Sequence, residues 1–136
     1  DMLCQRILIV AAHGPMRAIA QGDDGDLVLL WDSTLLYLTR DSLLCLDDVL
    51  TRAKHEESVS TDQFQWHPAP DDAALVWMGR TCFYLPSEDK PIFCALVHEA
   101  AEQLRSLALR ELRSQSPFSP AFCQLTVAEA DEVALN

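Results

Sequence analysis

Apolar and polar residues fall in blocks along the chain, and the spacing inside each block predicts a strand, a helix or a turn. Residues 6–12 (RILIVAA) form an apolar run with β-branched side chains and predict a strand, and 16–20 predicts a second, shorter one. The stretch 21–26 (QGDDGD) concentrates glycine and aspartate, so we expect a turn there. Apolar runs at 27–31 and 35–39 flank three polar residues and predict a hairpin.

Two later segments carry apolar residues at steps of three and four, which is the spacing of one helix face. The first helix is predicted over 42–54, with Asp41 or Ser42 as its N-cap. The second is predicted over 92–113, where Pro91 suits the first turn of a helix. The apolar stripe of this second helix comprises Phe93, Leu96, Val97, Ala100, Leu104, Leu107 and Leu112.

The remaining segments complete an α+β pattern. Residues 55–72 are mostly polar and contain two prolines, so we predict a mobile loop. Apolar runs at 73–78 and 81–85 flank a Gly-Arg tip and predict a second hairpin. Thr126 and Glu129 fit a capping box and predict a last short helix. No internal repeat is evident. We therefore expect a single α+β domain over 1–136, an antiparallel sheet with the long amphipathic helix and a shorter helix packed on one face.

The two runs of the first hairpin are apolar at nearly every position, whereas a half-exposed strand alternates. Leu27, Leu29 and Trp31 are expected to face the long helix. The opposite set then faces away from it and predicts a partner-binding surface, because several large apolar side chains on an exposed face indicate an interaction site. That set is Val28, Leu30, Leu36 and Leu38. A slip of one residue would exchange the two sets.

Composition narrows the kinds of partner. The formal net charge is −11, from 21 acidic and 10 basic residues, and the basic residues are scattered among acids. Nucleic acid and anionic membranes need a basic stripe, so neither is expected as a partner. No apolar run approaches the ~20 residues that span a bilayer. A basic protein partner would be favoured through faster encounter, although acidity also serves solubility.

Cysteine usage indicates a reducing compartment. The five cysteines are odd in number, widely spaced and set among apolar neighbours, with no Cys-x-x-Cys pair. This pattern predicts buried free thiols, no disulfide and no structural zinc. The first thirty residues do not resemble a secretory signal. We therefore expect a cytoplasmic protein.

Segments that resemble chemical motifs are incomplete. His98-Glu99-Ala-Ala-Glu102 lacks the second histidine of a zinc-protease helix and predicts an ordinary pair four residues apart on a helix face. The aspartates at 23, 24 and 26 lack the closing glutamate of a calcium loop and predict a solvated turn, and His13 also suits a structural turn. No nucleophile elbow, phosphate loop or dinucleotide motif occurs. We expect no catalytic, cofactor-binding or metal-binding residues and no cofactor. A cysteine acting with one of the four histidines remains an alternative.

The C-terminal half resembles type III secretion chaperones of the class that serves single effectors. The resemblance is carried by an apolar-Trp strand, a second strand, a short acidic turn and a long amphipathic helix. These correspond to Leu75-Val76-Trp77, Cys82-Phe83-Tyr84-Leu85, Ser87-Glu88-Asp89 and the helix that begins near Phe93. The chain departs from that family at its start, where a strand-like segment stands in place of an amphipathic helix.

The resemblance implies a cytoplasmic homodimer that binds an extended stretch of an effector, without catalysis. It places self-association on the second hairpin, at Trp77 and Phe83. Two other functions stay open: a small cytoplasmic enzyme that uses a cysteine or histidine, and a structural subunit of a larger assembly. The latter would explain the apolar strands equally well.

Overall fold

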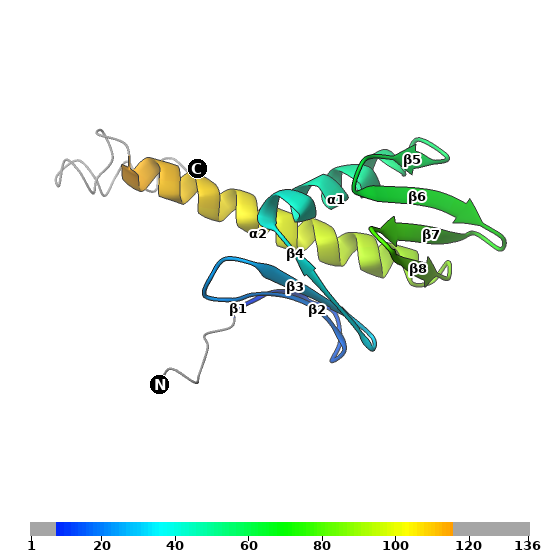
Figure 1. Cartoon of the computed structure of the whole chain (residues 1–136), viewed down its shortest axis with the longest axis horizontal. Coiled ribbons are helices and arrows are strands. Elements are labelled where there is room, and N and C mark those ends of the chain that lie inside the picture. The colour runs from blue at the N-terminus through cyan, green and yellow to red at the C-terminus, as the bar shows by residue number, and fades with distance from the viewer. Residues whose placement is uncertain (1–7, 116–136) are drawn as a thin grey trace. The chain divides into compact units, whose positions relative to one another are not determined.

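The computed structural model describes the backbone of residues 8–115 and the side chains of residues 8–110. It contains eight strands and two helices in that range (Figure 1). In chain order they are β1 (Leu8–Ala12), β2 (Arg17–Gln21), β3 (Leu27–Trp31), β4 (Thr34–Leu38), α1 (Arg40–Arg52), β5 (Val59–Ser60), β6 (Phe64–Ala69), β7 (Ala73–Met78), β8 (Thr81–Leu85) and α2 (Lys90–Gln115). The short helix predicted near Thr126 lies outside the described residues.

The strands form two antiparallel sheets, each a meander of four consecutive strands. Sheet A has the order β1-β2-β3-β4 and sheet B has the order β5-β6-β7-β8. The predicted α+β class is confirmed, and the strands divide between two sheets where one was expected. The predicted strands at 27–31, 73–78 and 81–85 match β3, β7 and β8 at both ends.

The chain comprises two compact units, with the boundary between Ala101 and Glu102 inside α2. Both sheets, α1 and the first part of α2 lie within the first unit. The single domain predicted for residues 1–136 stays a prediction.

Both helices begin close to their predicted positions. Thr39 caps α1, because its hydroxyl accepts a hydrogen bond from the backbone N–H of Ser42 at 3.1 Å. The predicted caps, Asp41 and Ser42, lie inside the first turn instead. α1 contacts β5 and β6 of sheet B (Figure 1).

Phe93 links the first part of α2 to both sheets. Its ring meets Trp31 of sheet A edge-on at 5.0 Å between centroids, and it lies 6.0 Å from the ring of Phe83 of sheet B. Phe93 is fully buried. Aromatic pairs at such distances add to the energy of simple burial. Phe93 is therefore a central residue of the first unit's core.

The segment 55–72 is largely structured. It contains β5 and β6, and β6 pairs with β7 along six residues. The loop predicted here is wrong, because the polar residues Gln65 and His67 alternate with the buried Phe64 and Trp66. This is the pattern of a half-exposed strand.

We expect limited proteolysis to cut this segment first at Lys54, Glu56 or Glu57. Residues 54–58 are all exposed and lie between α1 and β5, whereas β6 is held on both sides by backbone hydrogen bonds. Trypsin and a glutamate-specific protease, followed by mass spectrometry, would locate the cuts. First cleavage inside β6 or β7 would contradict this expectation for the internal part of the chain.

The last three strands of sheet A and the last three strands of sheet B have the same pairing register. Each partner pair within β2–β4 has a counterpart 47 positions later within β6–β8, the difference between Thr34 and Thr81. Arg17 faces Trp31 as Phe64 faces Met78, and the same holds through every following pair. A helix follows each sheet. The repeat lies in the strand pairing and is not evident in the sequence.

The two copies also match in the backbone conformation of their turns and in which positions are buried. Gly25 and Asp32 have positive φ in the first copy, and their counterparts Asp72 and Gly79 have positive φ in the second. Only glycine and a few polar residues adopt this conformation readily. The buried positions also correspond: Ile19 with Trp66, Leu27 with Ala74, Leu29 with Val76, Trp31 with Met78, and Leu38 with Leu85.

Candidate protein-interaction face

The outer face of sheet A is formed by two rows of side chains that cross the strands. Residues paired across antiparallel strands point to the same face. One row runs Ile9, Ala20, Val28, Tyr37, and the other runs Ala18, Leu30, Leu35. Ile9, Leu35 and Tyr37 are exposed by 57%, 59% and 75%. This face is therefore an exposed apolar surface.

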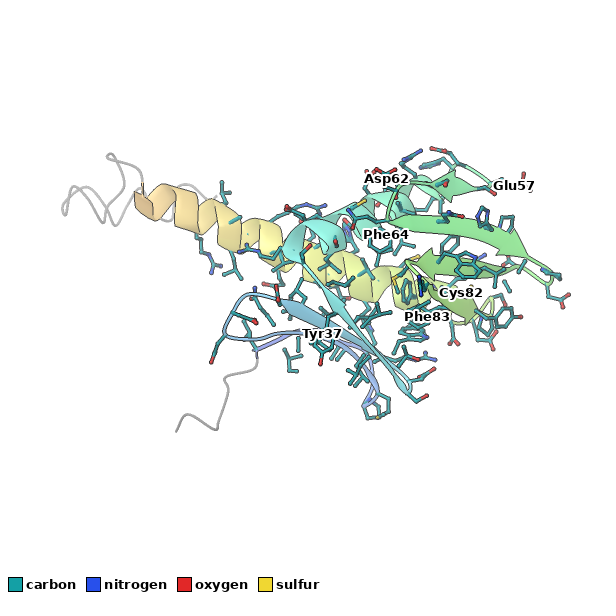
Figure 2. All side chains as sticks on the ribbon, viewed as in Figure 1. Tyr37, Glu57, Asp62, Phe64, Cys82 and Phe83 are labelled. Carbon is teal, nitrogen blue, oxygen red and sulfur yellow. The ribbon has the colours of Figure 1, made fainter. Side chains whose placement is uncertain are left out.

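A trough of about 530 Å³ lies on this outer face. Its floor includes the small residues Ala18 and Ala20 of β2, and larger side chains rise on the neighbouring strands. Figure 2 labels Tyr37, which lies on β4 at the edge of sheet A. The trough is of the size that proteins use to take up apolar side chains or small ligands. We call it the sheet A trough. Its lining comprises Ile9, Ala18, Ala20, Gln21, Gly22, Asp24, Asp26, Val28, Leu30, Leu35 and Tyr37.

The predicted face of β3 is confirmed, and the predicted face of β4 is wrong by one residue. Val28 and Leu30 point outward, while Leu27, Leu29 and Trp31 are buried. Leu36 pairs with Leu29, and Leu38 pairs with Leu27, so both belong to the inner face. Leu35 and Tyr37 take their places outside. The hairpin turn has two residues where three were expected, which moves the start of β4 and exchanges its faces.

The two residues predicted for self-association lie on opposite faces of sheet B. Val76 and Phe83 are partners, and Phe83, labelled in Figure 2, is buried. Its ring lies 6.0 Å from that of Phe93. Phe83 is thus a core residue and is not available to a second chain. Trp77 is 41% exposed on the outer face of sheet B, and the neighbouring Tyr84 is 58% exposed on the same side.

The outer edge of β4 is open in the described part of the chain. β4 pairs with β3 alone, and none of its backbone groups takes part in a hydrogen bond with a loop or helix of residues 8–115. Its five residues carry no charge and no proline. Natural proteins usually protect an exposed edge strand, since its unpaired groups accept another strand. The edge adjoins the sheet A trough.

Acidic groups mark one end of the trough. Asp24 and Asp26 lie in the turn between β2 and β3, and the Asp24 carboxylate accepts a hydrogen bond from the Asp26 backbone N–H at 3.0 Å. This fits the predicted solvated turn. Tyr37 lies at the same end, because its partner Val28 follows that turn. A basic group here would meet two carboxylates and an aromatic ring.

At the other end of the sheet, Arg17 joins the hairpin turn to Asp89, the residue before α2. Its guanidinium donates to Asp32 at 2.9 Å and to Asp89 at 3.1 Å, and it lies 4.1 Å from the centre of the Trp31 ring. The hydrogen bonds that Arg17 donates to Asp32 raise the pKa of Arg17 and lower the pKa of Asp32. This cluster holds the turn in place and leaves the acidic end of the trough as the end that suits a cation.

The histidines singled out by sequence have structural partners. His98 bonds to Asp47 of α1 at 3.1 Å, not to Glu102 as expected, and Asp47 is buried. The carboxylate of Glu99 lies 3.1 Å from His13 in the turn after β1. Glu102 pairs with Arg105. His98, Glu99 and Glu102 therefore each contact a different residue and do not form one site.

Two of the three cysteines in the described range have thiols whose pKa is raised by burial. Burial raises the pKa of Cys94 and of Cys82, which favours the protonated, unreactive form. Within residues 8–110, Cys94 makes no hydrogen bond with His98, and no three His, Cys, Asp or Glu side chains are grouped to hold a metal ion. Cys4 and Cys123 lie outside the described residues. No helix in the described range is long and apolar enough to cross a bilayer.

No protein-family model matches this sequence, and no curated protein matches it.

Proposed function

We propose that this chain is a protein-binding chaperone or adaptor that holds an extended segment of a partner protein at sheet A. The observation that carries the proposal is the exposed apolar trough beside the open edge of β4. A segment that pairs with β4 satisfies its backbone groups, and alternate side chains then fall over the outer face. Leu35 and Tyr37 are the first side chains it would meet.

The partner segment that fits best is apolar with a basic end. The trough is apolar along most of its length and ends at Asp24 and Asp26. The net charge of −11 favours approach by a basic partner. An arginine or lysine beside Tyr37 would gain from the carboxylates and from the ring.

The resemblance to type III secretion chaperones agrees with this function, and the family, the cytoplasmic location and the lack of catalysis stay predictions. Self-association also stays a prediction. It now rests on Trp77 without Phe83, because Phe83 is buried. Light scattering on the purified chain would test for a homodimer.

The proposal is tested with a labelled peptide of about six residues, which is the usual length of a strand. It carries leucine at alternate positions, threonine between them and arginine at one end, and a second peptide has glutamine in place of arginine. A Val28→Asp/Leu35→Asp double variant is expected to weaken binding of the arginine peptide at least about tenfold, a loss of about 1.4 kcal/mol. Fluorescence anisotropy measures the affinity.

Met16→Asp is the matched control, because Met16 is an exposed apolar residue that does not line the trough. It should bind as the unmodified chain does. Unchanged affinity in a folded double variant would place the site elsewhere. If neither peptide binds the unmodified chain, the proposed function is wrong.

A further inference from the structure

The internal repeat places a second open edge in sheet B. β8 corresponds to β4, and the strands share a Thr-x-x-Tyr-Leu pattern: Thr34, Tyr37 and Leu38 recur as Thr81, Tyr84 and Leu85. Tyr84 is exposed, as Tyr37 is, and both final leucines are buried. The repeated strand therefore keeps the same outward-facing tyrosine.

The four sheet edges differ in how they are protected. β1 is interrupted by an irregular register between Ile9 and Ala11, and β5 has only two residues. Bulges and short strands are two devices that prevent pairing with other chains. β4 and β8 each have five residues in unbroken register, without charge or proline. Within residues 8–115 the two unprotected edges are therefore the two copies of one element.

The backbone of β8 also has no outer partner in the described range. β8 pairs with β7 alone, and no backbone hydrogen bond joins it to a loop or helix of residues 8–115. The groups that a strand would need are thus available, as they are on β4. On the outer face, Leu75, Trp77 and Tyr84 border this edge.

The acidic turn is repeated as well. Asp71 occupies the position of Asp24, in the turn that precedes the hairpin leading to the open edge. Asp72 follows it and pairs with Lys90 at 3.1 Å. The second edge thus has an acidic turn at the same end of its sheet as the first. Like the β4 edge, it suits a segment with a basic end.

We propose that β8 is a second docking edge for an extended, apolar segment with a basic end, so that one chain holds two such segments of a partner protein. This inference rests on the proposed function of the β4 edge. The two sites differ in the side chains on the outer faces of their sheets. Ala18 and Ala20 leave a trough in sheet A, whereas Gln65 and His67 stand at the equivalent positions in sheet B and bond to each other at 3.0 Å. The β8 site therefore relies on the edge, Trp77 and Tyr84.

The test is the number of peptides bound per chain. Isothermal titration with the arginine peptide is expected to give two peptides per unmodified chain. Tyr84→Lys and Tyr37→Lys are each expected to reduce this to one, because a lysine on an edge strand opposes pairing and repels the basic end. Both tyrosines are exposed, so neither change disturbs the core. Met16→Lys is the control and should still bind two.

The outcomes separate the two proposals. One peptide per unmodified chain, lost in Tyr37→Lys and retained in Tyr84→Lys, would overturn the second edge and leave the proposed function standing. Two chains joined in a dimer that Tyr84→Lys separates would assign β8 to a second copy and would also overturn it. If the arginine peptide binds neither the unmodified chain nor any variant, the proposed function itself is wrong.

Discussion

A Phe93→Ala variant is expected to lose about 3–5 kcal/mol in free energy of unfolding, the usual cost of truncating a buried phenylalanine. Phe93 is fully buried and meets Trp31 of sheet A and Phe83 of sheet B. Removing the ring therefore leaves a cavity and removes both aromatic contacts. Urea denaturation followed by circular dichroism would measure the loss.

Leu109→Ala is the control, because Leu109 lies on the same helix and is exposed. It should change the free energy of unfolding by no more than about 0.5 kcal/mol. A loss below about 1 kcal/mol for Phe93→Ala would show that this ring does not hold the two sheets to α2.

Two neighbouring leucines of β3 are expected to respond to the same substitution in opposite ways. Leu29→Asp should cost about 4 kcal/mol or more, because it would bury a carboxylate among apolar side chains. Leu29 is fully inaccessible to solvent. Leu30→Asp points outward, so the fold should persist while binding of the arginine peptide to the trough weakens.

Thermal unfolding of both variants, together with anisotropy for Leu30→Asp, would test this pair. The substitution is the same and the positions are adjacent, so helix and strand propensities cancel. Equal destabilisation of the two variants would mean that sheet A is covered on both faces. Normal unfolding of Leu29→Asp would mean that the faces of β3 are exchanged.

Local patterns were sufficient for both helices, for most of the strands and for part of the site, but they missed β5 and β6. The hairpin at 73–85 was predicted to the residue, since Gly79 and two flanking apolar runs specify a tight turn. The buried face of β3 was predicted correctly, although all five of its residues are apolar and the pattern alone did not distinguish the two faces. On β4 every inner and outer residue is apolar or aromatic apart from Thr34, so only the register could separate Leu36 from Tyr37.

Sequence comparison within the chain did not suggest the repeat. Across β2–β4 and β6–β8 the same residue recurs at only a few positions, among them Asp24 with Asp71 and Tyr37 with Tyr84. The residues at equivalent buried positions differ in size. Ile19 corresponds to Trp66, and Leu27 corresponds to Ala74. A core accepts such exchanges when neighbouring volumes compensate, so the common register survives while the residues change.

The sequence by itself determined both helices, six of the eight described strands, the acidity and an apolar surplus on β3 and β4, because these depend on periodicity and composition along a short stretch of chain. The tertiary structure alone decided that the strands form two equivalent sheets and that Phe83 is buried while Tyr84 is exposed. It also decided that His98 pairs with Asp47. These features depend on which strands pair, in which register, and on which helix covers each face. Such contacts join residues far apart in the chain, and no local pattern specifies them.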